Sequence, residues 1–348
     1  MFVLENGNAD PFVGSFQWKG KITDATNLWA IDGTVLQHPT GQLYFIWSGW
    51  EDNLTGRQML YIARMSNPWT ITGARVEISR PTNTWETNQS PHVNEGPEVS
   101  IRNGLISLVY SASGSWSDSY CLGLITASVT SNLTDPASWQ KRPNPIFRSS
   151  GLIYGPGHHS FTKSRDDLED WIVYHSARYK GAVWIRQIRV QRFTWNADST
   201  PNLGSPVDPN VPIPVPSGDL PRTRYEAEGA SLSSPARIML HPSASNGSKV
   251  GGIDWANSMA VFSVQCSRAG AYVIAVRTGN GSPSNATASH LLKINSGTDI
   301  ILLTVFSGWN NWGTSMTRAN LTQGTNTLSF KKGTDYVEID AVDIFLDE

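Results

Sequence analysis

Two acidic residues and a histidine stand in three short glycine-containing segments that are far apart in the sequence. They are Asp32 in Trp29-Ala-Ile-Asp-Gly33, Glu95 in Asn94-Glu-Gly-Pro97 and His158 in Gly155-Pro-Gly-His158. Two carboxyl groups can break a glycosidic bond, because a protonated one donates to the leaving oxygen while an ionised one activates water or attacks the sugar. The chain also holds 14 Trp, whose faces can stack on sugar rings. These residue types point to glycoside hydrolysis.

A repeated strand pattern gives the three segments comparable positions. Its aromatic anchors, Trp47, Tyr110 and Tyr174, are 63 and 64 residues apart and lie in apolar runs. Strand units that recur at such a period are typical of a β-propeller. Counting back fifteen residues from the anchors gives, in order, Asp32, Glu95 and His159, which lies beside His158. Equivalent positions in successive blades face one central axis, so we expect two carboxylates and an imidazole to converge there.

Each of these residues also has an ordinary structural interpretation. Asp32 precedes Gly33 and could close a turn, while His158 could be a hydrogen-bonded core histidine. Glu95 has a rival in Glu98, and residues three apart on a regular strand point to opposite faces, so only one of them would face the axis. The shared offset favours Glu95 over Glu98 and a functional role for all three residues.

Composition excludes several classes of protein. Charged residues make up 16% of the chain against a usual share of about 25%, and the formal net charge is −2 without a cluster of Lys or Arg. Nucleic acid and membranes are therefore not expected as partners. The sequence has no apolar run of the roughly 20 residues needed to span a membrane. It also has no nucleophile elbow, phosphate loop or zinc motif, and we expect no organic cofactor.

A proline-rich segment at residues 200–222 divides the chain into parts of different texture. Residues 1–217 hold most of the Trp and the strand repeat. Residues 223–348 hold short alternating strands between Gly, Asn and Ser turns, which is typical of a β-sandwich. The sequence predicts an all-β protein: a partial β-propeller over 1–217 and a jelly-roll sandwich module over 223–348.

The first part resembles glycoside hydrolase family 43. The resemblance rests on four segments in order: Trp29-Ala-Ile-Asp-Gly-Thr-Val35, Asn94-Glu-Gly-Pro-Glu-Val99, Tyr154-Gly-Pro-Gly-His158 and Arg189-Val-Gln-Arg-Phe-Thr-Trp195. It implies a five-bladed propeller and an inverting enzyme of the α-L-arabinofuranosidase, arabinanase or β-xylosidase type. The expected substrate is an arabinose-containing plant polysaccharide such as arabinan or arabinoxylan.

The same resemblance implies roles for individual residues. Glu95 would be the general acid, and Asp32 the carboxylate that orients it and raises its pKa. His158 would be the central histidine, associated in many members with a bound ion or water cluster. Arg186 would contact the substrate. Two further candidate substrate-binding residues, Trp29 and Trp50, are chosen because aromatic faces stack on sugar rings.

The chain departs from the family pattern at its start. Members begin with a blade that carries a catalytic Asp, the general base, and three repeats cannot close a propeller, so we expect the first blades to be absent here. Asp10 in Ala9-Asp-Pro11 imitates the base motif but precedes Asp32 by only 22 residues, and it is better interpreted as a turn residue. We therefore expect these 348 residues to bind carbohydrate but to hydrolyse arabinofuranosides weakly or not at all.

Two non-catalytic alternatives follow from this departure. One is a carbohydrate-binding protein whose propeller is a remnant without a general base and whose sandwich does the functional work. The other is a lectin-like propeller that never had activity. The second is disfavoured because the Asp32, Glu95 and His158 segments are all present.

The second part resembles carbohydrate-binding module families 6 and 35. The similar segments are Tyr225-Glu-Ala-Glu228, Val250-Gly-Gly-Ile-Asp254, Gly308-Trp-Asn-Asn-Trp312, Leu321-Thr-Gln-Gly324 and Ile339-Asp340. A structural Ca²⁺ is expected from the hard oxygen ligands of Glu226, Glu228, Asp340 and Asp343, although these acids could simply face solvent on an edge strand. The candidate sugar-stacking residues are Trp255, Trp309 and Trp312, of which one or two could belong to the core.

The expected location is extracellular, and the expected state is a monomer. Seven Asn-x-Ser/Thr sequons and the family resemblance favour secretion. Against this, the chain as given opens without a basic region followed by an apolar stretch, so we expect no signal peptide in it.

Overall fold

The computed structural model describes residues 1–348 apart from 12, 54–55, 210, 283–285, 306–307 and 348. The chain divides into two compact units, Met1–Asp219 and Leu220–Glu348. The division falls within the proline-rich segment. Among the described residues, no helix has the length and apolar character needed to cross a membrane.

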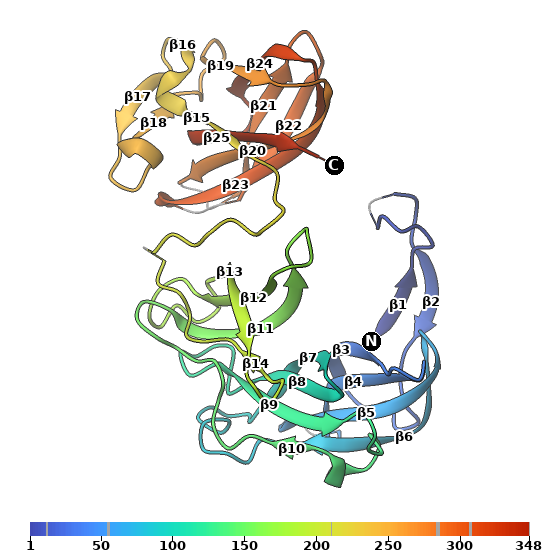
Figure 1. The fold of residues 1–348 in the computed structure, drawn as a ribbon. Helices are drawn as coiled ribbons and strands as arrows, with labels where there is room; N and C mark the ends of the chain where they lie inside the picture. Colours follow the sequence, from blue (N-terminus) through green and yellow to red (C-terminus); the bar gives the residue numbers. More distant parts are fainter. Residues whose placement is uncertain (12, 54–55, 210, 283–285, 306–307, 348) are drawn as a thin grey trace. The chain divides into compact units, whose positions relative to one another are not determined.

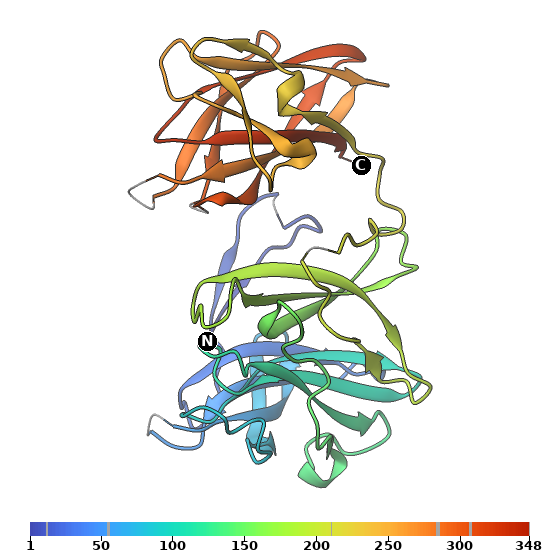
Figure 2. The ribbon, with the colours of Figure 1, turned by 90° about the vertical axis from the view of Figure 1, so that its left-hand side faces the viewer.

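The first unit contains three four-stranded antiparallel sheets that follow one another in chain order (Figures 1 and 2). The first sheet is β3 (Ala30–Gln37), β4 (Leu43–Trp50), β5 (Gln58–Asn67) and β6 (Thr70–Ser79). The second is β7 (Asn94–Arg102), β8 (Leu105–Ala112), β9 (Cys121–Ser128) and β10 (Gln140–Lys141), with the short helix η1 (Pro136–Ser138) before β10. The third is β11 (Tyr154–Lys163), β12 (Asp170–Ala177), β13 (Arg186–Trp195) and β14 (Pro201–Asn202). The first strand of the second sheet, β7, contacts both β3 and β11.

The second strand of each sheet carries one aromatic anchor of the repeat. Trp47, Tyr110 and Tyr174 are 3%, 0% and 3% exposed. The runs around them are almost continuously apolar because the strands are buried on both faces. The propeller-type arrangement predicted from the repeat is confirmed.

A two-stranded hairpin precedes the first sheet. It is formed by β1 (Phe2–Glu5) and β2 (Gln17–Lys21). Met1 and Val3 pack against the core around Trp47, whereas Phe2 and Trp18 form an exposed ring pair. Asp10 lies in the exposed loop of the hairpin, where its carbonyl accepts a hydrogen bond from the Val13 amide over 3.1 Å. This is the turn that the sequence favoured for Asp10.

The second unit is a sandwich of two antiparallel sheets around one apolar core (Figure 1). One sheet contains β15 (Thr223–Glu226), β17 (Arg237–Leu240), β18 (Ser248–Gly251), β20 (Gly270–Asn280), β23 (Gly308–Leu321) and β25 (Glu338–Leu346). The other contains β16 (Ser231–Ser233), β19 (Met259–Cys266), β21 (Ala288–Ile294), β22 (Asp299–Thr304) and β24 (Gly324–Lys332). Short helices η2 (Ala227–Gly229) and η3 (Ser245–Gly247) connect strands at one side.

Candidate active site

The innermost strand of each propeller sheet carries a β-bulge opposite the aromatic anchor of that sheet. The bulged pairs are Asp32–Gly33 opposite Trp47, Gly96–Pro97 opposite Tyr110 and His158–His159 opposite Tyr174. The first residue of each pair has a left-handed backbone, with φ of 54° at Asp32, 53° at Gly96 and 49° at His158. A bulge of this kind bends its strand and re-aims the neighbouring side chains.

The bulges correct the fifteen-residue offset used in the sequence analysis. The structurally equivalent residues are Asp32, Gly96 and His158, which lie 15, 14 and 16 residues before their anchors. The connection between the first two strands therefore differs slightly in length from sheet to sheet. Glu95 directly precedes its bulge, and His158 rather than His159 takes the position of Asp32.

His158 and His159 occupy different surroundings. His159 is 3% exposed and packs against the ring of Phe161, and burial lowers its pKa to about 3. It is a neutral core histidine. The His158 side chain is 41% exposed, and its backbone amide donates to Ser111 Oγ over 2.8 Å. His158 is the member of the pair that faces the other site residues.

The three residues that the sequence singled out do converge, each from a different sheet. Asp32 Oδ2 accepts a hydrogen bond from the Gly96 amide over 3.0 Å, so the first bulge is tied to the second. His158 Nε2 lies 3.7 Å from Asp32 Oδ1, and His158 Nδ1 lies 4.0 Å from Glu95 Oε1. The imidazole therefore stands between the two carboxyl groups.

Glu95 has the environment of a proton donor. It is 8% exposed, and the Tyr120 hydroxyl donates to its Oε1 over 2.6 Å. Desolvation by burial raises the pKa of Glu95, and the Asp32 charge raises it further, against the opposing effects of Tyr120, His158 and Arg186. A carboxyl group that keeps its proton to higher pH is suited to general acid catalysis.

The prediction that Glu95 and Glu98 face opposite sides of their strand is wrong. Glu95 pairs with Ser111 and Glu98 with Val109, and these partners are two residues apart on β8, so they share a face. The bulge between the two glutamates inserts the extra residue that restores the same orientation. Burial also raises the pKa of Glu98. Glu95 differs from it in having the Tyr120 hydroxyl and the Asp32 charge as neighbours.

Two residues of the site, Tyr120 and His175, were not predicted from the sequence. Tyr120 is fully buried, and its hydroxyl also lies 3.3 Å from His158 Nδ1. Its ring packs so closely over Gly157 that a β-carbon there would lie 2.3 Å from a ring atom, which only glycine avoids. The ring of His175 is close to parallel with those of Tyr120 and His158, with centroids 5.8 and 5.9 Å away, and burial lowers the pKa of His175 to about 4. Tyr120 comes from a loop outside the repeat, so no spacing signal marks it.

Arg186 lies beside this group but is largely occupied by the protein. Its Nη1 donates to the Ser115 carbonyl over 2.7 Å, its Nη2 donates to the Gly155 carbonyl, and its Nε donates to His175 Nδ1. The guanidinium also lies 5.5 Å from the centre of the Tyr120 ring. Arg186 therefore braces the third sheet against the segment that carries Tyr120.

Trp29 and Trp50 stack on each other at the same end of the first sheet. Their ring centroids are 4.6 Å apart with an interplanar angle of 18°, and Trp29 is 38% exposed. Trp50 also lines a cavity of about 400 Å³ together with Arg57, Gln58 and His92. Trp29 presents aromatic surface three residues before Asp32 in the sequence, and exposed indole rings suit a sugar-binding role.

The sequence profile of glycosyl hydrolases family 43 matches residues 1–201. The chain belongs to this family. An extracellular exo-α-(1→5)-L-arabinofuranosidase of Streptomyces avermitilis is 40% identical over 254 residues, covering 67% of this chain and 52% of the relative. An α-L-arabinofuranosidase 43 of Humicola insolens is 39% identical over 259 residues, covering 72% of this chain and 52% of the relative. The family-43 chain thus spans about half the length of these curated relatives.

A solved structure of an arabinofuranosidase is also similar to this chain. The α-L-arabinofuranosidase of Lactobacillus brevis superposes with a TM-score of 0.56 at 37% identity, covering 61% of this chain and 67% of the other. The likeness supports the propeller-type arrangement of the first unit in this family-43 protein.

In the sandwich of the family-43 chain, an open pocket of about 340 Å³ lies between two loops and the start of β23. It is lined in part by Asp254, Trp255, Trp309 and Tyr336. Trp255 is 61% exposed and Tyr336 47%, and Asp254 Oδ1 is buried without a hydrogen-bond partner among the described residues. Trp312 lies outside this lining, with its Nε1 donating to the Ser243 carbonyl over 2.7 Å.

The predicted calcium ligands divide into two kinds. Glu226 and Glu228 each keep one carboxylate oxygen that is buried without a hydrogen-bond partner in the described structure. Asp340 pairs with Arg277, and Asp343 pairs with Arg224 over 2.7 Å. Within the described ranges, no group of three or more His, Cys, Asp or Glu is close enough together to hold a metal ion, around His158 or elsewhere.

The neighbours of Glu95 predict opposite pH effects for two substitutions. Asp32→Asn removes a charge that raises the pKa of Glu95, whereas Tyr120→Phe removes a hydrogen bond that lowers it. Activity that needs protonated Glu95 declines as pH rises through this pKa. We expect Asp32→Asn to move the alkaline limb of the pH–rate profile to lower pH, and Tyr120→Phe to move it to higher pH, each by roughly one unit. Shifts in the same direction would contradict the proton-donor assignment.

Proposed function

We propose that the first unit forms the acid-donating part of an inverting glycosidase site that acts on α-L-arabinofuranosides. The observation that carries the proposal is the buried Glu95 carboxyl, which has a raised pKa and lies beside Asp32 and Tyr120. The names of the Streptomyces, Humicola and Lactobacillus relatives favour arabinofuranose as the sugar released.

Three residues take part in protonating the glycosidic oxygen. Glu95 donates its proton to the glycosidic oxygen as the bond to the anomeric carbon breaks. Asp32, fixed by the Gly96 amide, keeps the proton on Glu95 until the leaving oxygen needs it. The Tyr120 hydroxyl holds Glu95 Oε1 in place and stabilises the carboxylate that remains after proton transfer.

An inverting reaction also needs a base that activates water on the opposite side of the sugar. We assign no described residue to that role, because Asp10 lies in the turn of the hairpin. A second candidate function is that of a binding protein, in which the first unit binds the sugar without efficient turnover and the sandwich provides most of the affinity. The exposed Trp255 and Tyr336 rings at the sandwich pocket favour it.

Product analysis separates the two candidates. The protein is incubated with arabinan oligosaccharides and with an aryl arabinofuranoside, and arabinose release is followed against a Glu95→Gln control. Release that depends on Glu95 supports the hydrolase. Equal background release from both proteins, together with retained binding of the oligosaccharides, supports the binding protein.

We further propose that the sandwich is a carbohydrate-binding module whose site is the pocket at Trp255. Exposed aromatic rings beside a buried, unpaired carboxylate oxygen suit a sugar, which presents an apolar face and a ring of hydroxyls. The partner would be a plant cell-wall polysaccharide such as arabinan or arabinoxylan, bound by a secreted monomer.

Removing the exposed rings is expected to weaken this binding. Trp255→Ala and Tyr336→Ala should each weaken polysaccharide binding by about tenfold or more, because aromatic anchors carry much of the energy of such contacts. Affinity electrophoresis of the full chain in gels that contain arabinan or arabinoxylan measures the change. Trp312→Phe is the matched control, since its ring lies outside the pocket lining. Equal losses in all three variants would contradict the assignment of the pocket.

We also propose that Glu226 and Glu228 bind a structural Ca²⁺ together with backbone or water oxygens, as their unpartnered oxygens favour. Addition of Ca²⁺ should raise the melting temperature of the sandwich by several degrees, because a ligand that binds the folded state stabilises it. Calorimetry with Ca²⁺ and with a chelator measures this. Glu226→Gln should lose the response, whereas Asp343→Asn, whose carboxylate is held by Arg224, should retain it.

A further inference from the structure

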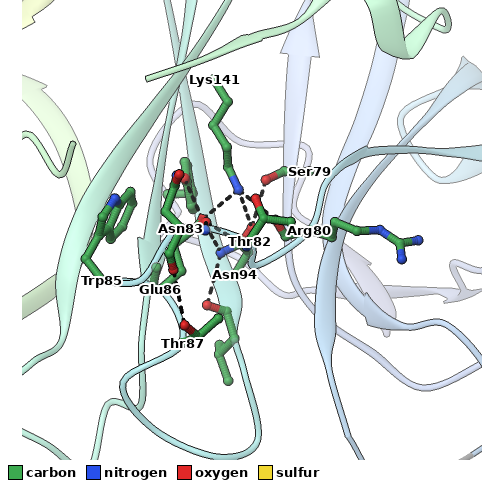
Figure 3. Close-up of polar contacts among 12 residues, drawn as sticks. Ser79, Arg80, Thr82, Asn83, Trp85, Glu86, Thr87, Asn94 and Lys141 are labelled. Carbon is green, nitrogen blue, oxygen red and sulfur yellow. Dashed lines mark hydrogen bonds and ion pairs between the residues drawn. The ribbon is translucent and has the colours of Figure 1, made fainter. Parts of the chain in front are cut away.

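A buried carboxylate behind the candidate active site joins the first two propeller sheets (Figure 3). Glu86 lies in the segment between β6 and β7, and its side chain is 0% exposed. Its Oε1 accepts from Lys141 Nζ at 2.6 Å, Tyr110 Oη at 2.8 Å and Asn94 Nδ2 at 2.9 Å. Its Oε2 accepts from the amides of Thr82 at 2.9 Å and Asn83 at 2.8 Å. Both oxygens are fully satisfied, as a buried charge requires.

Asn94 connects this carboxylate to the first sheet. Its Oδ1 accepts from Ser79 Oγ on β6 over 2.7 Å, and its backbone carbonyl accepts from Ser48 Oγ on β4 over 2.8 Å. Figure 3 shows the side chains of Glu86, Asn94 and Lys141 directed toward one another, with Ser79 beside them. Asn94 Oδ1 also accepts from Lys141 Nζ on β10 over 3.4 Å, so Asn94 is held from both sheets at once.

Asn94 immediately precedes Glu95 on β7, and no bulge separates them. Their side chains therefore point to opposite faces of the strand, one into the buried network and the other into the candidate site. Fixing Asn94 fixes the backbone from which Glu95 projects.

We infer that Asn94, clamped by Glu86, is a positioning residue for Glu95. It holds the strand just before the bulge, so that the Glu95 carboxyl stays under Tyr120 and next to Asp32. The inference rests on the proposed role of Glu95 as proton donor, but its test does not require turnover.

Asn94→Leu is the sharpest variant because it removes the link without changing a charge. Glu95 is faced by Asp32 from β3, Tyr120 from the segment before β9, His158 from β11 and Arg186 from β13. None of these is altered. If the strand loosens, Glu95 gains water and loses part of the desolvation that raises its pKa.

The titration of Glu95 is followed by NMR in protein labelled at the glutamate carboxyl carbons, with Glu95→Gln identifying the signal. In Asn94→Leu we expect the midpoint to fall by about one pH unit. Tyr110→Phe is the matched control, because it removes a hydrogen bond from Glu86 and leaves Asn94 in place. Its Glu95 midpoint should stay within about 0.3 units of the wild type.

Two results would overturn the inference. One is an unchanged Glu95 midpoint in a destabilised Asn94→Leu protein, which would make the network structural only. The other is an equal shift in Tyr110→Phe, which would indicate general loosening. If Asn94→Leu does not fold, Ser79→Ala, which removes one donor to Asn94 Oδ1, decides by the same criteria. Failure of the proposed hydrolase is recognised separately, as arabinose release that does not depend on Glu95.

Discussion

Replacing Glu95 by glutamine is expected to lower kcat/KM for arabinan oligosaccharides by about 10²- to 10⁴-fold, the usual contribution of a general acid. Glutamine keeps the shape of the side chain and can still accept from Tyr120, but it has no proton to give to the leaving oxygen. The loss should be smaller for an aryl arabinofuranoside with a good leaving group, which needs less protonation. Steady-state kinetics on both substrates measure the difference.

Glu98→Gln is the informative companion to this variant. Glu98 shares the face of Glu95 and also has a pKa raised by burial, but it is not hydrogen-bonded to Tyr120. We expect it to retain most activity on both substrates. If Glu98→Gln showed the greater loss on the poor leaving group, the proton donor would be Glu98, and the assignment of Glu95 would fall.

Glu86→Ala is expected to destabilise the first unit by about 3–5 kcal/mol, the usual cost of breaking a buried ion pair by removing one partner. The substitution leaves Lys141 without its counter-ion and leaves the Thr82 and Asn83 amides without an acceptor. Urea unfolding followed by tryptophan fluorescence measures the change in the free energy of unfolding. Glu51→Ala is the control: its pair with Arg80 is largely exposed, and the expected loss is within about 1 kcal/mol.

The contribution of Glu86 should depend on pH. Desolvation alone would raise the pKa of Glu86, but the Lys141 charge and the hydrogen bonds hold it below its ordinary value of 4.5. Because the folded-state pKa is depressed, the stabilisation is present above the unfolded pKa and is lost as pH falls through the folded value. Desolvation also lowers the pKa of Lys141 against the pull of Glu86, so the pair gains less than the shift of Glu86 alone implies. The difference in stability between wild type and Glu86→Gln should shrink below pH 4.5. A difference that grows there would contradict an ionised Glu86.

The elements that follow the strand repeat could be predicted from the sequence. Trp47, Tyr110 and Tyr174 mark buried strands because a strand covered on both faces needs a continuous apolar run. Their spacing also located Asp32 and the neighbourhood of Glu95. A prediction from the repeat fails where a single extra residue is inserted. The bulge beside Glu95 is such an insertion, and it places Glu98 on the face opposite to the predicted one.

Residues in irregular segments could not be found in this way. Tyr120 and Glu86 come from loops that have no counterpart at the repeat spacing, and their partners are 25 and 55 residues away along the chain, at Glu95 and Lys141. Such contacts depend on the path of the loop in three dimensions. Many hydroxyl and carboxyl groups in the chain can form hydrogen bonds, so residue type alone does not predict that Tyr120 and Glu86 make these contacts.

The directions of the site side chains are set within the strands, at the three bulges. Asp32, Glu95 and His158 are aimed by hydrogen-bonded ladders, two of which are tied directly through Asp32 and the Gly96 amide. Two connecting segments also take part in this aiming: the one that carries Tyr120 and the one that carries Glu86, which holds Asn94. Loops other than these two can therefore change in length and sequence while the Glu95 carboxyl stays in place. Selection, or an engineer exchanging such loops between related proteins, can then vary the surroundings of the site without moving Asp32, Glu95 and His158.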